Sequence, residues 1–350
     1  MPNSKLFLDS GYVNIEWILS LGYPFNFIWG ARGTGKTYGA LKYVLENNTR
    51  FMLTRTRQKQ ADMIKRKEFS PFKPLNEDLH TLIITEALGK DYASFYHGVY
   101  DENDKLKPYG EPIGVVSALS TIGDLRGFSA EDITLWIYDE FIQEKGEMPL
   151  KNQGFLFANG YETINRNREL KGKKPLQVLC MSNSENPMSE IFIFYGLLLK
   201  VAEMNRTGQE TCFYPERGIA LFNLRNSPIS QKKAETALYK AVDRTSDFYR
   251  MAIENDFYSL SYEDVKSQNL QEYRIICTVG EISVYEHKNR DEIYISPTKS
   301  GAPLDIFTTD DRSLKAFIRK YVWLWDYYLE YRITFENPEC KLLLEKYFGK

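Results

Sequence analysis

Residues 30–37 of the chain match the pattern G-x-x-x-x-G-K-[ST] at every fixed position. The eight residues are Gly30, Ala31, Arg32, Gly33, Thr34, Gly35, Lys36 and Thr37. An apolar run, 25–29, precedes them, and a helix-like stretch, 38–46, follows. In that setting the glycines let backbone N–H groups surround a β-phosphate, and the next helix offers its positive N-terminus. The sequence therefore predicts a nucleoside triphosphate site on a P-loop fold.

Two neighbouring carboxylates end a second apolar run, 133–138. This is the form of a Walker B strand, in which Asp139 orders Mg²⁺ and Glu140 polarises the attacking water. Lys36 is then expected on the β- and γ-phosphates, with Thr37 as a Mg²⁺ ligand. A plain helix cap is the alternative for the acid pair. Because the sequence has no N-K-x-D motif for guanine, we expect ATP and Mg²⁺ as cofactors.

Three further side chains are candidates for catalysis. Asn183 follows the apolar run 177–181 and would hydrogen-bond the γ-phosphate or the attacking water, although an N-cap explains it almost as well. Arg166 and Arg126 lie on either side of the Walker B run. A guanidinium supplied by a neighbouring subunit stabilises transition-state charge, whereas most arginines form surface ion pairs. Both interpretations of the arginines stay open on the residues alone.

The bulk composition excludes some classes of function. The 350 residues suffice for two domains, and the net charge of −2 gives no overall attraction to nucleic acid or acidic membranes. The four cysteines form no C-x-x-C pair, which indicates reduced thiols in the cytoplasm. The most apolar run, 191–199, is shorter than the roughly 20 residues that cross a bilayer. We therefore expect no membrane partner.

Short apolar runs alternate with helix-like stretches over the first two hundred or so residues. The candidate strands are 25–29, 51–54, 81–85, 134–138 and 177–181. Their β-branched and aromatic residues suit strands buried on both faces, so a parallel α/β sheet with helices on both faces is predicted. The runs 94–99 and 112–118, separated by a polar turn, predict an inserted β-hairpin.

The composition changes after residue 201. The polar stretch 203–218 contains glycine and proline and is expected to be a connector, and 230–265 has helical spacing. Strands are predicted at 274–279, 282–286 and 292–296, followed by a helix over 314–331. The expected domains are an ATPase domain over 1–203, a helical linker domain over 204–270 and a C-terminal α+β domain over 271–350.

Two groups of side chains are candidates for DNA contact. Basic residues cluster after the second predicted strand and again in a later loop. They are Arg55, Arg57, Lys59, Lys65, Arg66 and Lys67, then Lys171, Lys173 and Lys174. Such patches can follow a phosphate backbone; a solvated helix face, or nucleotide and neighbour contacts by Arg55 and Arg57, are the alternatives. Tyr321, Trp325 and Tyr328 have the spacing of a core-facing helix stripe, which we favour over base stacking.

The ordered set of motifs resembles viral DNA-packaging ATPases. The loop at 30–37, Leu125-Arg126-Gly127, Asp139-Glu140-Phe141, the segment 163–168 and the strand ending in Ser182-Asn183 carry the resemblance, over roughly residues 20–190. It is nearest to the encapsidation ATPases of small, protein-primed, short-tailed phages (the phi-twenty-nine-like group), which are relatives of the large terminase subunit. The resemblance implies an additional-strand, catalytic-glutamate type of P-loop NTPase.

The resemblance also implies roles and partners. Arg166 would be a trans-acting arginine finger, Arg126 a basic residue at the subunit interface, and Arg32 a sensor of the γ-phosphate. The family forms a homomeric ring, typically of five subunits, that docks on the capsid portal and pumps double-stranded DNA into an empty head. Such a protein is expected in the host cytoplasm, transiently on the prohead and absent from the mature virion. A structural RNA is a further partner that the sequence leaves undetermined.

The C-terminal region departs from the nuclease pattern of terminases, whose RNase-H-like domains hold two metal ions with several carboxylates. The candidate first strand, 274–279, contains no acid. We therefore expect an RNase-H-like fold without nuclease residues that contacts DNA or the portal. For the whole chain, the alternatives are a helicase or recombinase-like ATPase, a small-molecule kinase, and a scaffold that binds ATP without turnover.

Overall fold

The computed structural model describes residues 5–30, 32–87, 92–125, 132–142, 150–183, 189–229, 236–241 and 264–349. Of these, the residues up to 191 together with 204–241 form one compact unit, and 192–203 with 264–349 form a second. Among the described residues, no helix is both long enough and apolar enough to cross a membrane.

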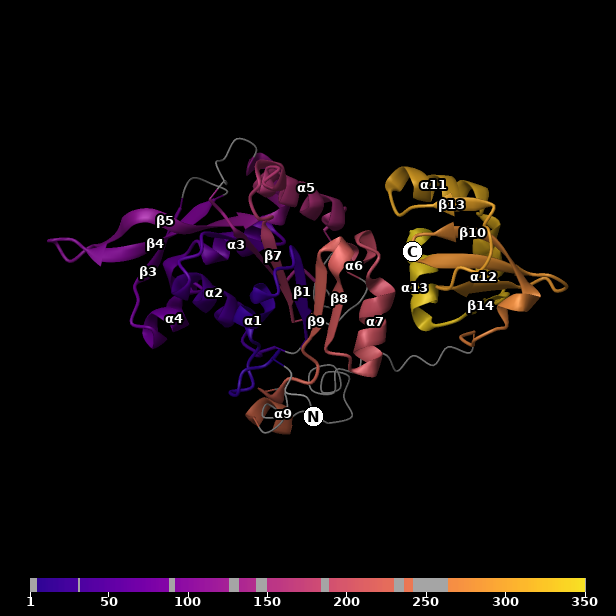
Figure 1. The fold of residues 1–350 in the computed structure, drawn as a ribbon, viewed down its shortest axis with the longest axis horizontal. Helices are drawn as coiled ribbons and strands as arrows, with labels where there is room; N and C mark the ends of the chain where they lie inside the picture. Colours follow the sequence, from indigo (N-terminus) through magenta and orange to yellow (C-terminus); the bar gives the residue numbers. More distant parts are fainter. Residues whose placement is uncertain are drawn as a thin grey trace. The chain divides into compact units, whose positions relative to one another are not determined.

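A nine-stranded sheet organises the first unit (Figure 1). Its strands are, in spatial order, β3 (Ile83–Ala87), β4 (Ala93–Tyr100), β5 (Leu106–Ala118), β2 (Phe51–Arg55), β6 (Leu135–Asp139), β7 (Gln177–Ser182), β1 (Phe25–Trp29), β9 (Ile219–Asn223) and β8 (Thr211–Tyr214). The strands from β5 to β9 in this order are parallel. The outermost strands pair antiparallel: β3 with β4 and β4 with β5 on one side of the sheet, and β8 with β9 on the other. The predicted parallel sheet and the β4–β5 hairpin are thus confirmed.

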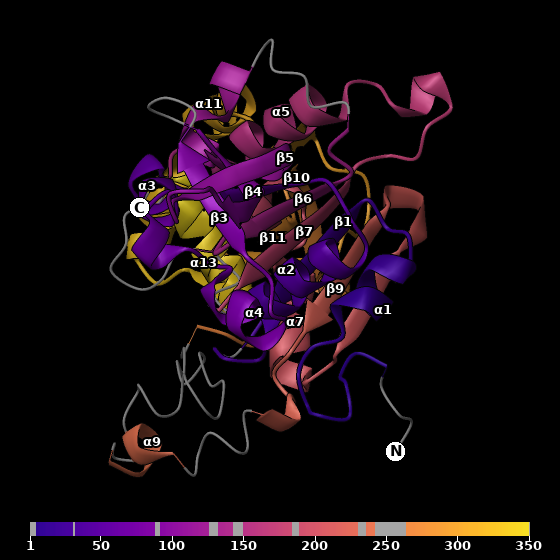
Figure 2. The same ribbon diagram turned by 90° about the vertical axis from the view of Figure 1, so that its left-hand side faces the viewer.

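Helices cover both faces of this sheet, as predicted. One face carries α1 (Ile15–Ser20), α2 (Lys36–Glu46), α3 (Gln58–Ile64) and α4 (Lys73–Asp78) (Figure 2). The other face carries α5 (Gln153–Asn165), whose Phe157 ring stacks on Trp136 of β6 at 4.9 Å. Successive side chains of a strand point to opposite faces, so the unbroken apolar strands are buried from both sides.

The predicted connector over 203–218 is wrong. This stretch contains the end of α7 (Leu198–Thr207) and the whole of β8, and β9 follows it directly. β9 pairs in parallel with β1, from Phe25 opposite Ile219 to Trp29 opposite Asn223. The glycine and proline residues mark the turns around β8 rather than a linker, because turn residues look alike in both settings. Of the helix expected over 230–265, residues 236–241 and 264–265 are described. Ala237–Ala241 form the helix α9, whereas Val265 forms a β-bridge with Phe335.

The second unit contains a five-stranded sheet, and three helices follow β13 (Asp305–Phe307) in the chain. A short helix, α6 (Glu190–Phe194), lies between β7 and α7 in the chain. The strand order is β13, β10 (Tyr273–Val279), β11 (Ile282–His287), β12 (Ile293–Ser296) and β14 (Ile333–Phe335). The helices are α11 (Asp311–Lys320), α12 (Trp323–Leu329) and α13 (Pro338–Tyr347). The three predicted strands, now β10 to β12, are confirmed within a residue or two.

The single helix predicted over 314–331 is instead two helices that meet at Tyr321 and Val322. Aromatic residues crowd this segment, and aromatic residues are mediocre helix formers. One straight helix has one core-facing stripe, whereas the break lets several rings pack. Tyr321 is 5 % exposed, and Trp325 stacks on Tyr328 at 4.8 Å. The expectation that these rings pack into the fold is confirmed.

Candidate active site

The loop after β1 has the backbone that its glycines allow. Gly30 and Gly35 have φ values of 132° and 83°, which L-residues rarely adopt. A Cβ atom at Gly35 would lie 2.9 Å from the ring of Tyr12, and one at Gly30 would lie 3.0 Å from Cβ of Leu224. Gly35 caps the N-terminus of the eleven-residue helix α2. The loop thus leads into a helix whose first N–H groups face outward along its axis.

Lys36 and Thr37 open this helix and lie at the site. Lys36 is 5 % exposed, and its Nζ donates to the carbonyl oxygen of Gly30 at 2.9 Å and to Oγ1 of Thr34 at 3.2 Å. Thr37 Oγ1 donates to Oδ2 of Asp139 at 2.9 Å. The two predicted Mg²⁺ ligands are therefore neighbours, although they are far apart in the chain. Arg32 and Gly33 are exposed, and Ala31 lies outside the described residues.

Asp139 and Glu140 share one cation, Arg55, which is a candidate for DNA contact, with a nucleotide or neighbour contact as the alternative. Arg55 ends β2, which lies next to β6. Its guanidinium donates to Oδ2 of Asp139 at 3.0 Å and to Oε2 of Glu140 at 2.6 Å. Burial would lower the pKa of Arg55, but the charges of Asp139 and Glu140 outweigh it and raise that pKa. In the sequence, the position of Arg55 directly after a predicted strand was the one signal of a role at the site. Its partners could be identified only once the order of the strands in the sheet was known.

The parallel strands β1, β6 and β7 end at one edge of the sheet, and this edge decides which of the other candidates lie near Asp139. Asn183 follows β7, and β7 lies between β1 and β6. Because all three strands are parallel, Asn183 lies at the edge that carries the loop and Asp139. Its side chain is partly exposed.

Arg166 lies at the opposite edge of the sheet. It caps the C-terminus of α5, with φ 46°. The adjacent Asn165 accepts the backbone N–H of Leu176, just before β7, at 2.9 Å, and Arg168 donates to the carbonyl oxygen of Ile133, just before β6. A five-residue strand spans roughly 16 Å, so the backbone of Arg166 lies about a strand length from the end of β6 that carries Asp139. Arg126 lies outside the described residues.

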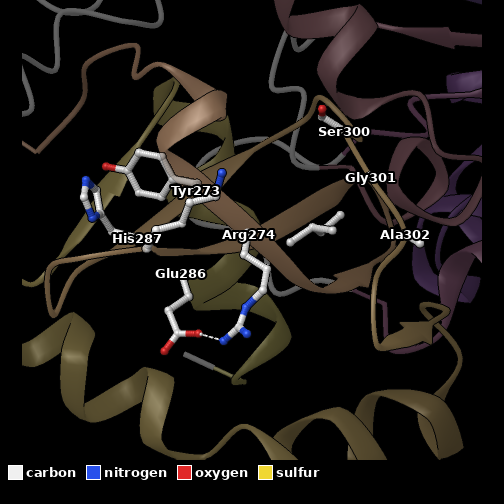
Figure 3. Close-up of a pocket in the computed structure, with 9 residues that line it drawn as sticks. Tyr273, Arg274, Glu286, His287, Ser300, Gly301 and Ala302 are labelled. Atoms are coloured by element: carbon white, nitrogen blue, oxygen red, sulfur yellow. Dashed lines mark hydrogen bonds and ion pairs between the residues drawn. The ribbon is translucent and has the colours of Figure 1, made fainter.

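The second unit has a pocket of about 440 Å³ at the start of β10 and the end of β11 (Figure 3). Arg274 and Glu286 line it and form an ion pair at 2.6 Å; both side chains are exposed. Among the residues that the structure describes, no group of three or more His, Cys, Asp or Glu side chains is placed to hold a metal ion.

A family model described as "Podovirus DNA encapsidation protein (Gp16)" matches residues 8–332. The chain belongs to this family. The resemblance drawn from the ordered motifs is thereby confirmed.

Individual relatives of this Gp16-family chain are distant but cover most of it. A "DNA packaging protein" of Bacillus phage PZA is 21% identical over 311 residues, which are 86% of this chain and 83% of that protein. The "DNA packaging protein" of Bacillus phage phi29 gives the same figures of 21% and 311 residues.

Two solved structures share the fold of the Gp16-family chain. One is "The bacteriophage Phi-29 viral genome packaging motor assembly", with a TM-score of 0.58 and 16% identity over 97% of this chain and 98% of that one. The other is "The Phi-28 gp11 DNA packaging Motor", with a TM-score of 0.57 and 16% identity over 96% of this chain and 95% of that one. Both likenesses extend over the two units of the chain.

Proposed function

We propose that this Gp16-family protein is an ATPase that drives double-stranded viral DNA into an empty prohead. The observation that carries the proposal is the convergence of Lys36, Thr37, Asp139 and Glu140 at one edge of a parallel sheet. The strand order supports assignment to the additional-strand class of P-loop NTPases, because β7 separates β1 from β6. A glutamate directly after the Mg²⁺ aspartate suits hydrolysis, whereas a kinase site must exclude water.

The donor set fits MgATP. Thr37 Oγ1 and Asp139 Oδ2, which are 2.9 Å apart, are the hard oxygen ligands that Mg²⁺ prefers. The loop N–H groups and Lys36 would hold the phosphates, and Arg32 is proposed as a γ-phosphate sensor. When bound, Mg²⁺ neutralises charge on the phosphate oxygens. Glu140, with a side chain 38% exposed, would orient and deprotonate the attacking water.

Arg55 would hold the two carboxylates until nucleotide binds. Its single positive charge lies between Asp139 and Glu140 and reduces the repulsion between the two carboxylates. Asn183, on the strand between them and the loop, is proposed to sense the γ-phosphate and to link hydrolysis to movement.

Arg166 is proposed to act on the site of a neighbouring subunit. Its place at the far edge of its own sheet supports a role in trans, since it is a strand length from Asp139 of the same chain. Such a role requires a ring of heterologous contacts, in which one edge of each subunit faces the other edge of the next. Arg126 is proposed as a second basic residue at that interface, and five subunits are expected from the resemblance.

DNA and portal contacts are proposed for surfaces outside the ATP site. The basic residues 57–67 follow Arg55 at the same sheet edge, and Lys171, Lys173 and Lys174 follow α5 at the other. In the second unit, Glu281 accepts the backbone N–H groups of Leu198 and Leu199 at 3.2 and 3.3 Å. Asp305 accepts from Lys320 and Tyr321. Both acids thus have structural partners, and we propose that the second unit is an RNase-H-like domain that contacts DNA or the portal without cutting DNA.

The test is protection of DNA from nuclease by purified empty proheads, this protein and ATP. The protein is expected in the host cytoplasm and on proheads, so this assay reproduces its setting. We expect full-length double-stranded DNA to be protected only when ATP is hydrolysed. Rapid ATP hydrolysis without protected DNA, and with stronger stimulation by single strands, would instead support a helicase.

A further inference from the structure

Glu140 has a backbone conformation that L-residues avoid. Its φ is 57°, in the left-handed region, and it is neither glycine nor asparagine. Such a conformation costs free energy and persists only where the surroundings hold it. The hydrogen bonds around Glu140 therefore show what the fold does to keep this one residue in place.

Three buried side chains form a hydrogen-bonded chain that ends on the backbone of Glu140. Thr56, Tyr138 and Gln153 are at most 2% exposed. Gln153 Nε2 lies 2.7 Å from the hydroxyl of Tyr138, that hydroxyl lies 2.9 Å from Oγ1 of Thr56, and Thr56 Oγ1 lies 3.3 Å from the carbonyl oxygen of Glu140.

The number of available protons determines which group donates and which accepts in each of these hydrogen bonds. Thr56 has one hydroxyl proton, and it is donated to the Glu140 carbonyl oxygen, so Tyr138 must donate to Thr56. Gln153 then donates one amide proton to Tyr138 and the other to the carbonyl oxygen of Phe141 at 2.7 Å. Bonds aligned in this way strengthen one another.

These side chains hydrogen-bond to the two peptide groups that follow Glu140. Thr56 holds the carbonyl of Glu140 and Gln153 holds the carbonyl of Phe141, while the N–H of Phe141 donates to the carbonyl oxygen of Met181 in β7 at 3.2 Å. Rotation of the Glu140 backbone toward a relaxed conformation would break at least one of these bonds. The anchors come from β6, β7, α5 and the residue after β2.

We propose that Thr56, Tyr138 and Gln153 are positioning residues that hold the Glu140 backbone in the left-handed conformation from which its carboxylate addresses the attacking water. This rests on the proposed ATPase function. The three residues lie within or next to the sheet and act through Glu140, so their loss should slow hydrolysis without weakening nucleotide binding. A misplaced base costs rate steeply, about 100-fold for 1 Å.

The test compares Thr56→Val with Thr56→Ser in the full-length protein. Valine keeps the shape and removes the hydroxyl, whereas serine retains it. We expect Thr56→Val to lower kcat by about 10- to 100-fold with KM for ATP within about twofold of wild type, and Thr56→Ser to restore most of kcat. Tyr138→Phe should behave as Thr56→Val does. Tyr161→Phe, which removes a bond to Leu176 at the opposite sheet edge, is the matched control with unchanged kcat.

Two results would overturn the inference: a wild-type kcat in Thr56→Val, or a fall in kcat that serine does not restore. Thermal denaturation of each variant identifies simple unfolding, and Thr56→Ser keeps the test valid if Tyr138→Phe fails to fold. Glu140→Gln distinguishes a failure of the proposed ATPase function from a failure of the positioning role alone. If Glu140→Gln hydrolyses ATP normally, the proposed function fails; if it is inactive while Thr56→Val is fully active, only the positioning role fails.

Discussion

At the scale of single residues, the site is a balance of two cations and two carboxylates. Lys36 bonds to the oxygen atoms of its own loop, and the single guanidinium of Arg55 forms ion pairs with both Asp139 and Glu140. Asp139 is 3% exposed, so Arg55 and Thr37, rather than bulk water, are the partners of its carboxylate. Removing one partner of a buried ion pair leaves an uncompensated charge, which costs more than the pair contributes.

Arg55→Ala should therefore destabilise the first unit by about 3 kcal/mol, the lower end of the range for buried pairs, since Arg55 keeps some exposure. Urea unfolding followed by circular dichroism measures the change. The matched control is Arg274→Ala, which removes an exposed pair with Glu286 and should cost about 1 kcal/mol or less. Equal stability losses in the two variants would contradict the buried role of Arg55.

Asp305 gives a residue-scale prediction for pH. Hydrogen bonds from Lys320 and then Tyr321 lower the pKa of Asp305 below its ordinary value. A carboxyl with a depressed folded-state pKa contributes stability above its unfolded pKa, near 4, and that contribution is lost as pH falls through the folded pKa. Asp305→Asn should thus flatten the loss of Tm on acidification from about pH 5 to 3. A slope for Asp305→Asn identical to that of the wild type would refute the assignment.

At the scale of elements, the site exists because parallel strands end at one edge. β1 leads into the loop, β2 ends in Arg55, β6 ends in Asp139, and β7 leads to Asn183. α2 begins where the loop ends, so its N-terminus faces the same edge. The geometry of the turn between β1 and α2 then decides whether phosphate can approach the backbone.

Gly35→Ala should weaken ATP binding at least tenfold, because alanine adds a strained φ and a clash with the ring of Tyr12. Isothermal titration calorimetry measures the affinity. Gly172→Ala is the control, since its φ is 68° but its new Cβ would meet nothing within 4 Å. Gly172→Ala should cost about 1–2 kcal/mol of stability and leave the affinity for ATP unchanged. Unchanged affinity in Gly35→Ala would show that the loop does not hold the phosphates as proposed.

Elements that local sequence defines were predicted well, and those that depend on distant pairing were not. The spacing of the loop residues and the apolar runs located β1, β6 and β7 within one or two residues. The role of Arg55 required the adjacency of β2 and β6, and β9 required its pairing with β1, which lies far earlier in the chain. The left-handed Glu140 was equally hidden, since no glycine or asparagine marks it. Pairing between strands is set by the whole fold rather than by local composition.

At the scale of the whole molecule, we propose different roles for the two edges of the large sheet at which its parallel strands begin and end. One edge carries the ATP site, and the other carries Arg166 with the lysines that follow α5. A ring in which each subunit presents its Arg166 edge to the next subunit's ATP site would complete every site with a residue from a neighbour.

Mixed rings test the trans role of Arg166. Arg166→Ala and Glu140→Gln subunits should each be inactive alone yet bind ATP. Mixed in equal amounts, they should recover roughly a quarter of wild-type hydrolysis, because about a quarter of the interfaces then pair an intact Glu140 with an intact Arg166. Phosphate release measures the recovery. Activity of Arg166→Ala alone near that of wild type, or no recovery on mixing, would contradict a shared site.

The central claim is that Glu140 activates water to hydrolyse ATP at the loop of residues 30–37. The most direct measurement is the rate of phosphate release by Glu140→Gln beside wild type, at equal and saturating ATP occupancy, with double-stranded DNA present. The account predicts that Glu140→Gln binds ATP as tightly as wild type and releases phosphate at least about 100-fold more slowly, the lower end of the range for loss of a general base. Phosphate release at the wild-type rate would contradict it.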